Sequence, residues 1–303
     1  MIKLEKISYH GWPNCYRYSN NLIELIVTTD IGPRIIHYGW RGGENQLFIM
    51  PETVGQSGGD QWNLYGGHRL WKAPEMFPQS HFPDNHPIQL EEHAGFMRLV
   101  QPVETTNQIQ KEMDIFLTET TEGVKIIHRL RNCSDHSMNL IPWGITALES
   151  GGVAVLPFQL NQDNPAPSVG LKVNVWDYTH VGDCRIQWRE NCLLVRQDVK
   201  ITRWLKMGLS SLLGVLGYLR GEHLFIKRVV TYPDECYPDG GSTVEVWTND
   251  RYLELETLAP VRSAEPGQMV EHVEFWALKK VVDPSTEGHA FEERIVPILL
   301  KTN

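Results

Sequence analysis

Cysteine is scarce in this chain of 303 residues. The placement of the few cysteines argues against a zinc-knuckle protein and against a disulfide-rich protein. The five cysteines are widely spaced and odd in number, and none forms the Cys-x-x-Cys pair of a metal knuckle. A disulfide framework is therefore not predicted, and a reducing cytoplasm is the simplest compartment.

Positive charge and long hydrophobic runs are also in short supply. The formal net charge is -9, which argues against a nucleic-acid groove and against binding to an anionic membrane surface. The N-terminus shows neither an apolar segment nor a small-residue cleavage site, so no secretory signal is expected. The most apolar stretch, 205–219, is the one possible helix, but it is too short to span a bilayer and contains Lys206. We expect no nucleic acid and no membrane among the partners.

Signatures of several enzyme classes are missing as well. The chain has no Walker loop and no strand-bound Gly-x-Gly-x-x-Gly, which disfavours NTPase and dinucleotide-binding functions. Ser57-Gly58-Gly59 lies in an expected loop with no strand before it, so it gives no support for a serine-hydrolase elbow. No cofactor is predicted.

What the chain does contain is a succession of short runs rich in β-branched and aromatic residues. Turn sequences such as Ser150-Gly151-Gly152 and Pro266-Gly267 separate these runs. The pattern predicts strands over 22–28, 34–38, 108–117, 123–132, 139–147, 152–156, 172–176, 185–188, 192–195, 224–230, 243–248, 252–257 and 270–277. More than a dozen strands, almost no helix and no linker predict an all-β fold, one large antiparallel sandwich in a single domain over 1–303.

The segment 55–87 follows neither the helical nor the strand period and combines aromatic with polar side chains. Long loops of this kind are uncommon inside a domain and tend to be functional when they are ordered. Aromatic rings cover the C–H face of a sugar, while charged and amide groups bind its hydroxyls. The side chains that suit this role are Trp62, Arg69, Trp71 and Glu75. The alternative is a loop that packs on its own aromatic residues.

Four histidines lie in this segment or shortly after it. Their spacing matches no compact metal-ligand motif, so sugar binding or a general-acid role is favoured over a metal site, and no metal is predicted. The four are His68, His81, His86 and His93.

Two further positions carry carboxylates that suit a binding site. Glu254 and Glu256 fall on the same face of the expected strand 252–257, because side chains alternate along a strand. If that face lines a cavity, repulsion between the two should raise at least one pKa and produce a general base. The alternative is a solvated outer face. Asp239, in a Pro-Asp-Gly turn, either contributes to the site or bonds its own backbone.

Four segments, in this order, together resemble the galactose mutarotase-like (aldose 1-epimerase) superfamily, and within it an epimerase-like branch. They are Gly32-Pro33-Arg34-Ile35-Ile36, Gly66-Gly67-His68-Arg69, His93-Ala94-Gly95-Phe96-Met97-Arg98, and Leu253-Glu254-Leu255-Glu256-Thr257 with the Pro266-Gly267 turn and the strand after it. The resemblance implies a β-supersandwich with a concave sugar-binding face, which includes Arg34 before the sugar site. It also implies a small-molecule carbohydrate as partner of a monomer or homodimer.

The chemistry that the resemblance implies is mutarotation, in which a base and an acid open and close the sugar ring. Glu256 takes the base position, Arg69 that of the hydroxyl-binding arginine and His93 that of the first histidine. The family's usual mid-chain acid histidine is replaced by Trp143 or Thr146. Either His68 or His93 then supplies the acid, or the protein binds sugars without epimerising them.

Two principal functions therefore stay open. The first is an aldose 1-epimerase-type isomerase with Glu256 as base, and the second is a non-catalytic carbohydrate-binding or sensing protein on the same scaffold. A lyase or hydrolase acting on an oligosaccharide is a third possibility, since unrelated activities share folds.

Overall fold

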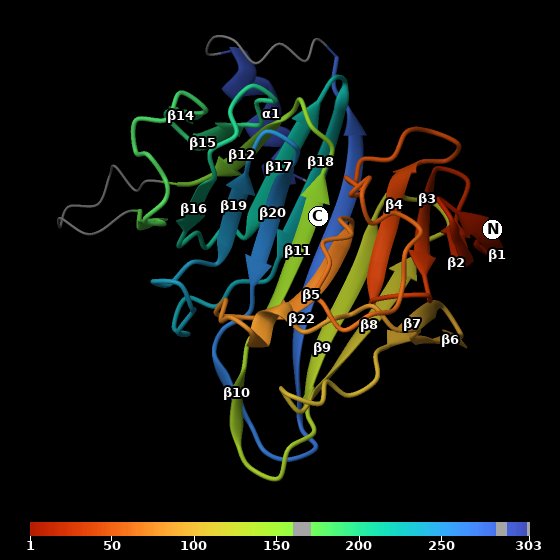
Figure 1. The fold of residues 1–303 in the computed structure, drawn as a ribbon. Helices are drawn as coiled ribbons and strands as arrows, with labels where there is room; N and C mark the ends of the chain where they lie inside the picture. The colour runs from red at the N-terminus through yellow and green to blue at the C-terminus, as the bar shows by residue number, and fades with distance from the viewer. Residues whose placement is uncertain (160–170, 283–289, 302–303) are drawn as a thin grey trace.

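The computed structural model of the protein describes residues 1–159, 171–282 and 290–301. Two ten-stranded antiparallel sheets, packed face to face, form the body of the fold (Figure 1). A short third sheet pairs β10 (Met138–Leu140) with β21 (Arg262–Ala264). The prediction of an all-β antiparallel sandwich is confirmed.

Sheet 1 has the strand order β1-β2-β3-β4-β5-β11-β20-β19-β16-β13. Its strands are β1 (Lys3–Tyr9), β2 (Trp12–Ser19), β3 (Ile23–Thr28), β4 (Arg34–Trp40), β5 (His68–Lys72), β11 (Pro142–Leu148), β20 (Leu253–Leu258), β19 (Val244–Thr248), β16 (Leu205–Leu209) and β13 (Val173–Val175). The middle of this sheet joins β5, β11 and β20, which come from distant parts of the chain. Segments that are remote in sequence therefore meet on one surface.

Sheet 2 has the order β14-β15-β12-β17-β18-β22-β9-β8-β7-β6. Its strands are β14 (Ile186–Trp188), β15 (Cys192–Arg196), β12 (Val153–Pro157), β17 (Val215–Arg220), β18 (His223–Val229), β22 (Met269–Lys280), β9 (Val124–Asn132), β8 (Ile109–Leu117), β7 (Phe96–Val100) and β6 (Gln89–His93).

The main core lies between the two sheets, because each strand turns alternate apolar residues inward. Leu25 and Tyr38 of sheet 1 pack in the same cluster as Ile115, Phe225 and Trp276 of sheet 2. On β20 the inward residues are Leu253 and Leu255. Glu254 and Glu256 therefore face away from sheet 2.

A single helix among the described residues, α1 (Ala290–Lys301), covers the outer face of sheet 2. Phe291, Ile295 and Leu299 recur at intervals of four and pack on β12, β17 and β18. The sequence analysis did not predict this helix. No helix in the described ranges is long and apolar enough to cross a membrane.

Each of the thirteen expected strands corresponds to at least one observed strand, but three interpretations were wrong. The apolar stretch 205–219 is not a helix, since it forms β16 and β17 with a turn between them at Gly214, whose φ is +55°. The segment 55–87 contains β5 and a 3₁₀ turn at Gln79–His81, so it is not wholly irregular. Finally, 139–147 divides into β10 and β11.

Candidate functional site

The outward face of sheet 1 holds a pocket of about 400 Å³, which we call the sheet pocket. Strand register places its floor residues side by side. Ile145 of β11 pairs with Arg69 of β5 on one side and with Glu256 of β20 on the other. Glu256 pairs in turn with Glu245 of β19. The predicted pair of glutamates thus lies on a pocketed face and not on a solvated outer one.

Two ion-pair groups form the floor of the sheet pocket. Arg69 donates from Nη1 to Oε1 of Glu254 at 2.8 Å. The ammonium group of Lys206 on β16 lies 2.9 Å from Oε2 of Glu245 and 2.9 Å from Oε2 of Glu256. All five side chains are more than nine-tenths buried, and the floor contains three carboxyl groups for two cations.

Burial determines how these groups hold protons. It raises the pKa of Glu254, which Arg69 only partly counteracts and the neighbouring Glu256 reinforces. Burial also raises the pKa of Glu245 well above its ordinary value. For Lys206, burial would lower the pKa, but the two carboxylates raise it above the ordinary value. The expectation that a glutamate on this strand has a raised pKa is met by Glu254.

Aromatic rings form the walls of the sheet pocket. On one side Trp71 and Trp143 meet edge to face at 5.6 Å, and Trp62 meets Trp71 at 5.8 Å. On the other side Trp204 and Trp247 lie 6.0 Å apart. These rings supply apolar faces above a polar floor, which is the composition that a sugar site needs.

Trp143 and Thr146, the two residues considered for the mid-chain acid position, point to opposite faces of β11. Its indole Nε1 donates to Oε2 of Glu256 at 2.9 Å, whereas Thr146 points between the sheets. Because Lys206 donates to the same oxygen, Oε2 receives two hydrogen bonds. Of the two residues, only Trp143 therefore lies next to Glu256.

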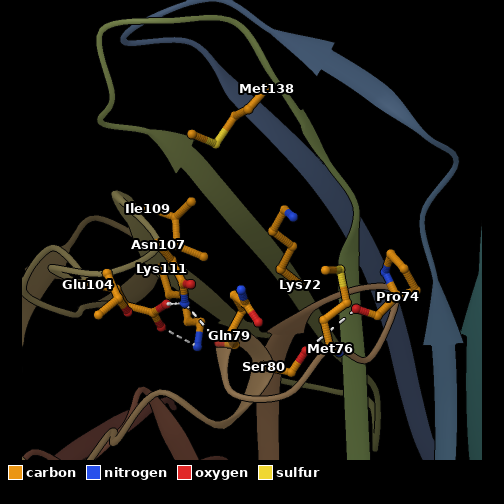
Figure 2. Close-up of a pocket in the computed structure, with 11 residues that line it drawn as sticks. Lys72, Pro74, Met76, Gln79, Ser80, Glu104, Asn107, Ile109, Lys111 and Met138 are labelled. Carbon is orange, nitrogen blue, oxygen red and sulfur yellow. Dashed lines mark hydrogen bonds and ion pairs between the residues drawn. The ribbon is translucent and has the colours of Figure 1, made fainter.

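The loop after β5 brings His81 to the rim of the sheet pocket. Figure 2 shows how the loop is held: Asn107 donates to the carbonyl of Gln79 at 2.8 Å and also binds Glu104. The hydroxyl of Ser80 accepts from the backbone of Met76 at 2.9 Å. These bonds fix the 3₁₀ turn, and so the histidine ring that the turn carries.

Five of the predicted site residues line the sheet pocket. Arg69, Trp71 and Glu256 belong to its strands, while Trp62 and Glu75 come from the long loops on either side of β5. The structure brings these residues together as expected, and the roles assigned to them stay predictions.

Four predicted site residues do not line the sheet pocket. Arg34 is buried and binds Asp84 and the carbonyl of Gly66, so it fastens the loop. Asp239 lies in a turn with φ +49° and does not line the pocket, but its carboxyl group hydrogen-bonds Glu245 of the pocket floor. His93 is on β6 at the edge of sheet 2, where it binds Glu91 at 3.1 Å. His68 faces the opposite side of β5 from Arg69.

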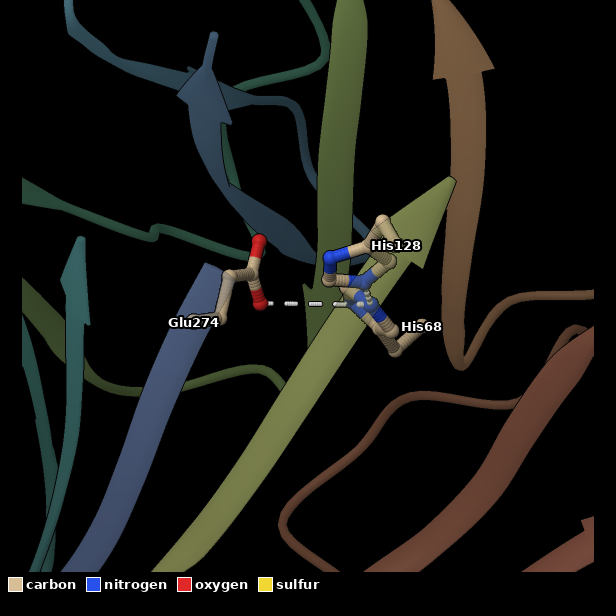
Figure 3. Close-up of side chains that lie close together, drawn as sticks. All are labelled: His68, His128 and Glu274. Atoms are coloured by element: carbon tan, nitrogen blue, oxygen red, sulfur yellow. Dashed lines mark hydrogen bonds and ion pairs between the residues drawn. The ribbon is translucent and has the colours of Figure 1, made fainter. Parts of the chain in front are cut away.

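His68 belongs to a polar cluster sealed between the sheets, which we call the inter-sheet cluster (Figure 3). Its Nε2 lies 2.7 Å from Nε2 of His128, and its Nδ1 lies 2.9 Å from the hydroxyl of Thr146. Lys227 donates to that hydroxyl at 3.0 Å and lies 3.0 Å from Glu274. All five side chains are wholly buried or nearly so.

The proton positions in the inter-sheet cluster follow from its bonds. The carbonyl of His272 can only accept, so Nδ1 of His128 carries a proton and its Nε2 accepts from His68. Nδ1 of His68 then accepts from Thr146. Burial lowers the pKa of His68, His128 and His272, which keeps all three rings neutral.

Of the described residues, His68, His128 and Glu274 come closest to a metal site, with ligand atoms within 4.8 Å of one another. However, both ring nitrogens of His68 and of His128 already make hydrogen bonds, and Lys227 already neutralises Glu274. A divalent cation would add uncompensated charge to a sealed site. The arrangement fits a neutral hydrogen-bond network better than a metal centre.

Sequence reasoning missed several residues that line the sheet pocket. Lys206 had been treated as an interruption of an apolar run, although a lone cation on a buried strand is itself a signal of a buried partner. Aromatic residues on later strands and turns were also missed, because only the fold places them opposite the loop: Tyr178, Trp204, Trp247 and Tyr252.

Comparison with known proteins bears on the fold. The sequence matches no protein-family model and no curated relative. A galactose mutarotase-like protein from Lactobacillus casei superposes with a TM-score of 0.58 and 8% identity, over 88% of this chain and 100% of its own. A galactose mutarotase-like protein from Clostridium acetobutylicum gives 0.57 and 11%, over 93% and 99%.

A TPR-domain containing protein from Parabacteroides distasonis also shares the fold, with a TM-score of 0.59 and 13% identity over 94% of this chain. The chain spans 50% of the length of that protein. Identities this low establish the fold alone. The chain has the galactose mutarotase-like β-sandwich fold, so the predicted resemblance and fold class are confirmed.

Proposed function

We propose that the protein binds an uncharged sugar in the sheet pocket. The observation that carries the proposal is the combination of facing aromatic walls with a floor of carboxylates and cations. Trp204, which is 57% exposed, and the partly exposed Trp62 offer apolar ring surface to the C–H groups of a pyranose, and Glu256 and Arg69 offer polar atoms to its hydroxyls. The size of about 400 Å³ falls within the usual range of small-molecule pockets.

Charge balance supports a neutral ligand over a phosphorylated one. Each cation that lines the pocket is already paired with a carboxylate: Arg69 with Glu254, Lys206 with Glu256, and Arg251 with Glu52. A phosphate would have to compete with these carboxylates for the cations. A hydroxyl, in contrast, can donate to a carboxylate and accept from a cation without breaking either pair.

Anomer interconversion is a second candidate, and one feature of Glu256 favours it. Lys206 and Trp143 both bind Oε2, so Oε1 is the oxygen left to accept a proton from an anomeric hydroxyl. His81 lines the same pocket and is a titratable group that can protonate a ring oxygen. The proton would move from the anomeric oxygen to Glu256, while His81 supplies another to the ring oxygen as the C1–O5 bond breaks.

A titration of tryptophan fluorescence with glucose, galactose and other neutral aldoses tests the binding proposal. Trp204→Ala removes a ring that is 57% exposed and lines the pocket, and we expect affinity to fall about threefold to tenfold. Trp188→Ala makes the same change at a 50% exposed ring on the edge of sheet 2 and should leave affinity unchanged. Equal affinities in the two variants, or no binding of any aldose, would refute the proposed site.

NMR measurement of anomer exchange separates the two candidates. If the second candidate is right, the wild-type protein accelerates exchange and Glu256→Gln abolishes the acceleration while binding persists. Saturable binding without any acceleration would leave the protein a sugar binder and reject the isomerase.

A further inference from the structure

A second cavity of about 940 Å³ adjoins the sheet pocket, and we call it the loop cavity. It lies between the long loop that flanks β5 and the segment 101–106 that follows β7. The two cavities meet at Trp62 and His81, whose rings line both. A ligand in the sheet pocket therefore reaches the loop cavity by passing these two rings.

A continuous series of aromatic contacts runs from one cavity to the other. Trp143 meets Trp71 at 5.6 Å, Trp71 meets His81 at 5.1 Å, and His81 meets Phe77 at 5.6 Å. Trp143 and Trp71 line the sheet pocket, and Phe77 lines the loop cavity. Trp71 and Trp143 are only 4% and 2% exposed, so they support this series from beneath. The rings that present apolar surface to a ligand are Phe77, which is 83% exposed, and the partly exposed Trp62 and His81 between the two cavities.

Buried polar atoms around the loop cavity have no hydrogen-bond partner among the described residues. Oε1 of Gln101 and Oδ1 of Asp84 are two such acceptors, in side chains that are 4% and 6% exposed. Nε1 of Trp62 is a buried donor without a partner. Nδ1 of His81 is also buried without a partner, and it can donate or accept depending on the tautomer. Leaving a buried polar atom without a partner costs about 1–3 kcal/mol, so these atoms point to a ligand with hydrogen-bonding groups of its own.

The charge of the loop cavity limits the chemistry of that ligand. Its lining includes Asp60 and Asp84 but no lysine or arginine. An anionic group such as a phosphate or a uronate would find no lysine or arginine in this lining to neutralise it. Hydroxyl groups suit the site, because each both donates to the acceptors Asp84 and Gln101 and accepts from Trp62.

We infer that the loop cavity binds a second sugar ring, so that the ligand is a neutral oligosaccharide of two or more units that spans both cavities. This inference rests on the proposed function, since it assumes that the first unit occupies the sheet pocket. It names the substrate class of that site: the sheet pocket holds one unit and the loop cavity holds its neighbour.

Titration of the whole protein with matched sugars tests the inference. Maltose, cellobiose and lactose are compared with glucose and galactose, and at least one disaccharide should bind about tenfold or more tightly than either of its component monosaccharides. Phe77→Ala removes a ring that is 83% exposed, and we expect it to lower disaccharide affinity about threefold to tenfold while leaving monosaccharide affinity unchanged. Phe275→Ala, the same change on the outer face of sheet 2, is the matched control and should change neither.

A second variant guards against a local effect of the Phe77 substitution. Val103→Arg places a long side chain at a 44% exposed position on the opposite wall of the loop cavity, and it should remove the preference for the disaccharide. Monosaccharides that bind as tightly as every disaccharide, or a preference that survives both substitutions, would overturn the inference and leave the proposed sheet pocket intact. No binding of any sugar would instead overturn the proposed function, and the inference with it.

Discussion

The sheet pocket and the inter-sheet cluster are built on opposite faces of the same three strands, yet they differ in almost every physical respect. Consecutive residues point to opposite sides of β5, β11 and β20, so Arg69 enters the pocket while His68 enters the cluster. Likewise Glu256 lines the pocket, and Thr257 binds His272 and Glu274 on the inner side. A one-residue offset thus separates a site open to ligands from one sealed against them.

The inter-sheet cluster and the sheet pocket differ in how many of their buried polar atoms have a hydrogen-bond partner. In the inter-sheet cluster the hydrogen bonds run without a gap from Lys227 through Thr146 and His68 to His128. In the sheet pocket Nε of Arg69 is buried and has no partner among the described residues. Buried polar atoms that are fully paired stabilise a fold, whereas unpaired atoms next to a cavity indicate binding.

The largest effect is expected from breaking the inter-sheet cluster. Lys227→Met should lower the free energy of unfolding by about 3–5 kcal/mol, because it leaves the carboxylate of Glu274 buried without its cation. Urea unfolding followed by circular dichroism measures the loss. Lys280→Met, at a 63% exposed side chain on the same strand β22 as Glu274, is the control and should change stability by less than about 0.5 kcal/mol.

If Lys227→Met proves as stable as the control, Glu274 must find another partner or a proton, and the cluster is not the rigid unit described above. A loss confined to sugar affinity, with stability unchanged, would reverse the assignment of structural and binding roles to the two faces.

Acid should weaken the inter-sheet cluster next most strongly. Burial holds the pKa of His272 at about 3, below its ordinary value of 6.5. Between those values the unfolded chain binds a proton that the native ring does not, so stability is fully present above pH 6.5 and falls as the pH drops toward 3. The slope is about 1.4 kcal/mol per pH unit for each such histidine, and His68 and His128 shift in the same direction.

Urea midpoints at pH 7.0 and pH 5.5 measure this loss. His272→Gln removes one titrating group from the cluster, so the difference between the two midpoints should be smaller in this variant than in the wild type. Identical differences in the two proteins would show that His272 is charged in the native state, contrary to its sealed position.

Much of the fold follows from the sequence because the strand period is local. Runs such as 123–132 and 270–277 carry their own alternation and turn signals, so β9 and most of β22 could be predicted directly. The failures also have local causes. Three glycines and a long apolar run in 205–219 hide two strands that are buried on both faces, where alternation disappears.

The candidate site was less accessible to sequence reasoning, because sheet order is not local. Nothing near Lys206 in the chain reveals that β16 lies two strands from β20, where its ammonium group meets Glu256. In the same way His68 and Arg69 are neighbours in sequence but enter different environments, and only the register of β5 against β11 decides which one faces the ligand. The glutamate pair was recognisable because both of its members share one strand.

The smallest expected effect is on sugar affinity, and it comes from comparing a histidine at the sheet pocket with one on sheet 2. His81 lines both the sheet pocket and the loop cavity, whereas His93 lies on the edge strand of sheet 2 and stacks on Phe96 at 4.6 Å. His81→Ala should weaken sugar binding about threefold to tenfold, through the loss of one ring and one hydrogen-bonding nitrogen. His93→Ala should leave both affinity and stability within about 0.5 kcal/mol of the wild type, since its ring is exposed. Tryptophan fluorescence titration measures the sugar affinity of the two variants side by side. A larger effect at His93 would mean that the ligand sits against sheet 2, because no rearrangement within the sheet pocket brings a ligand to that edge.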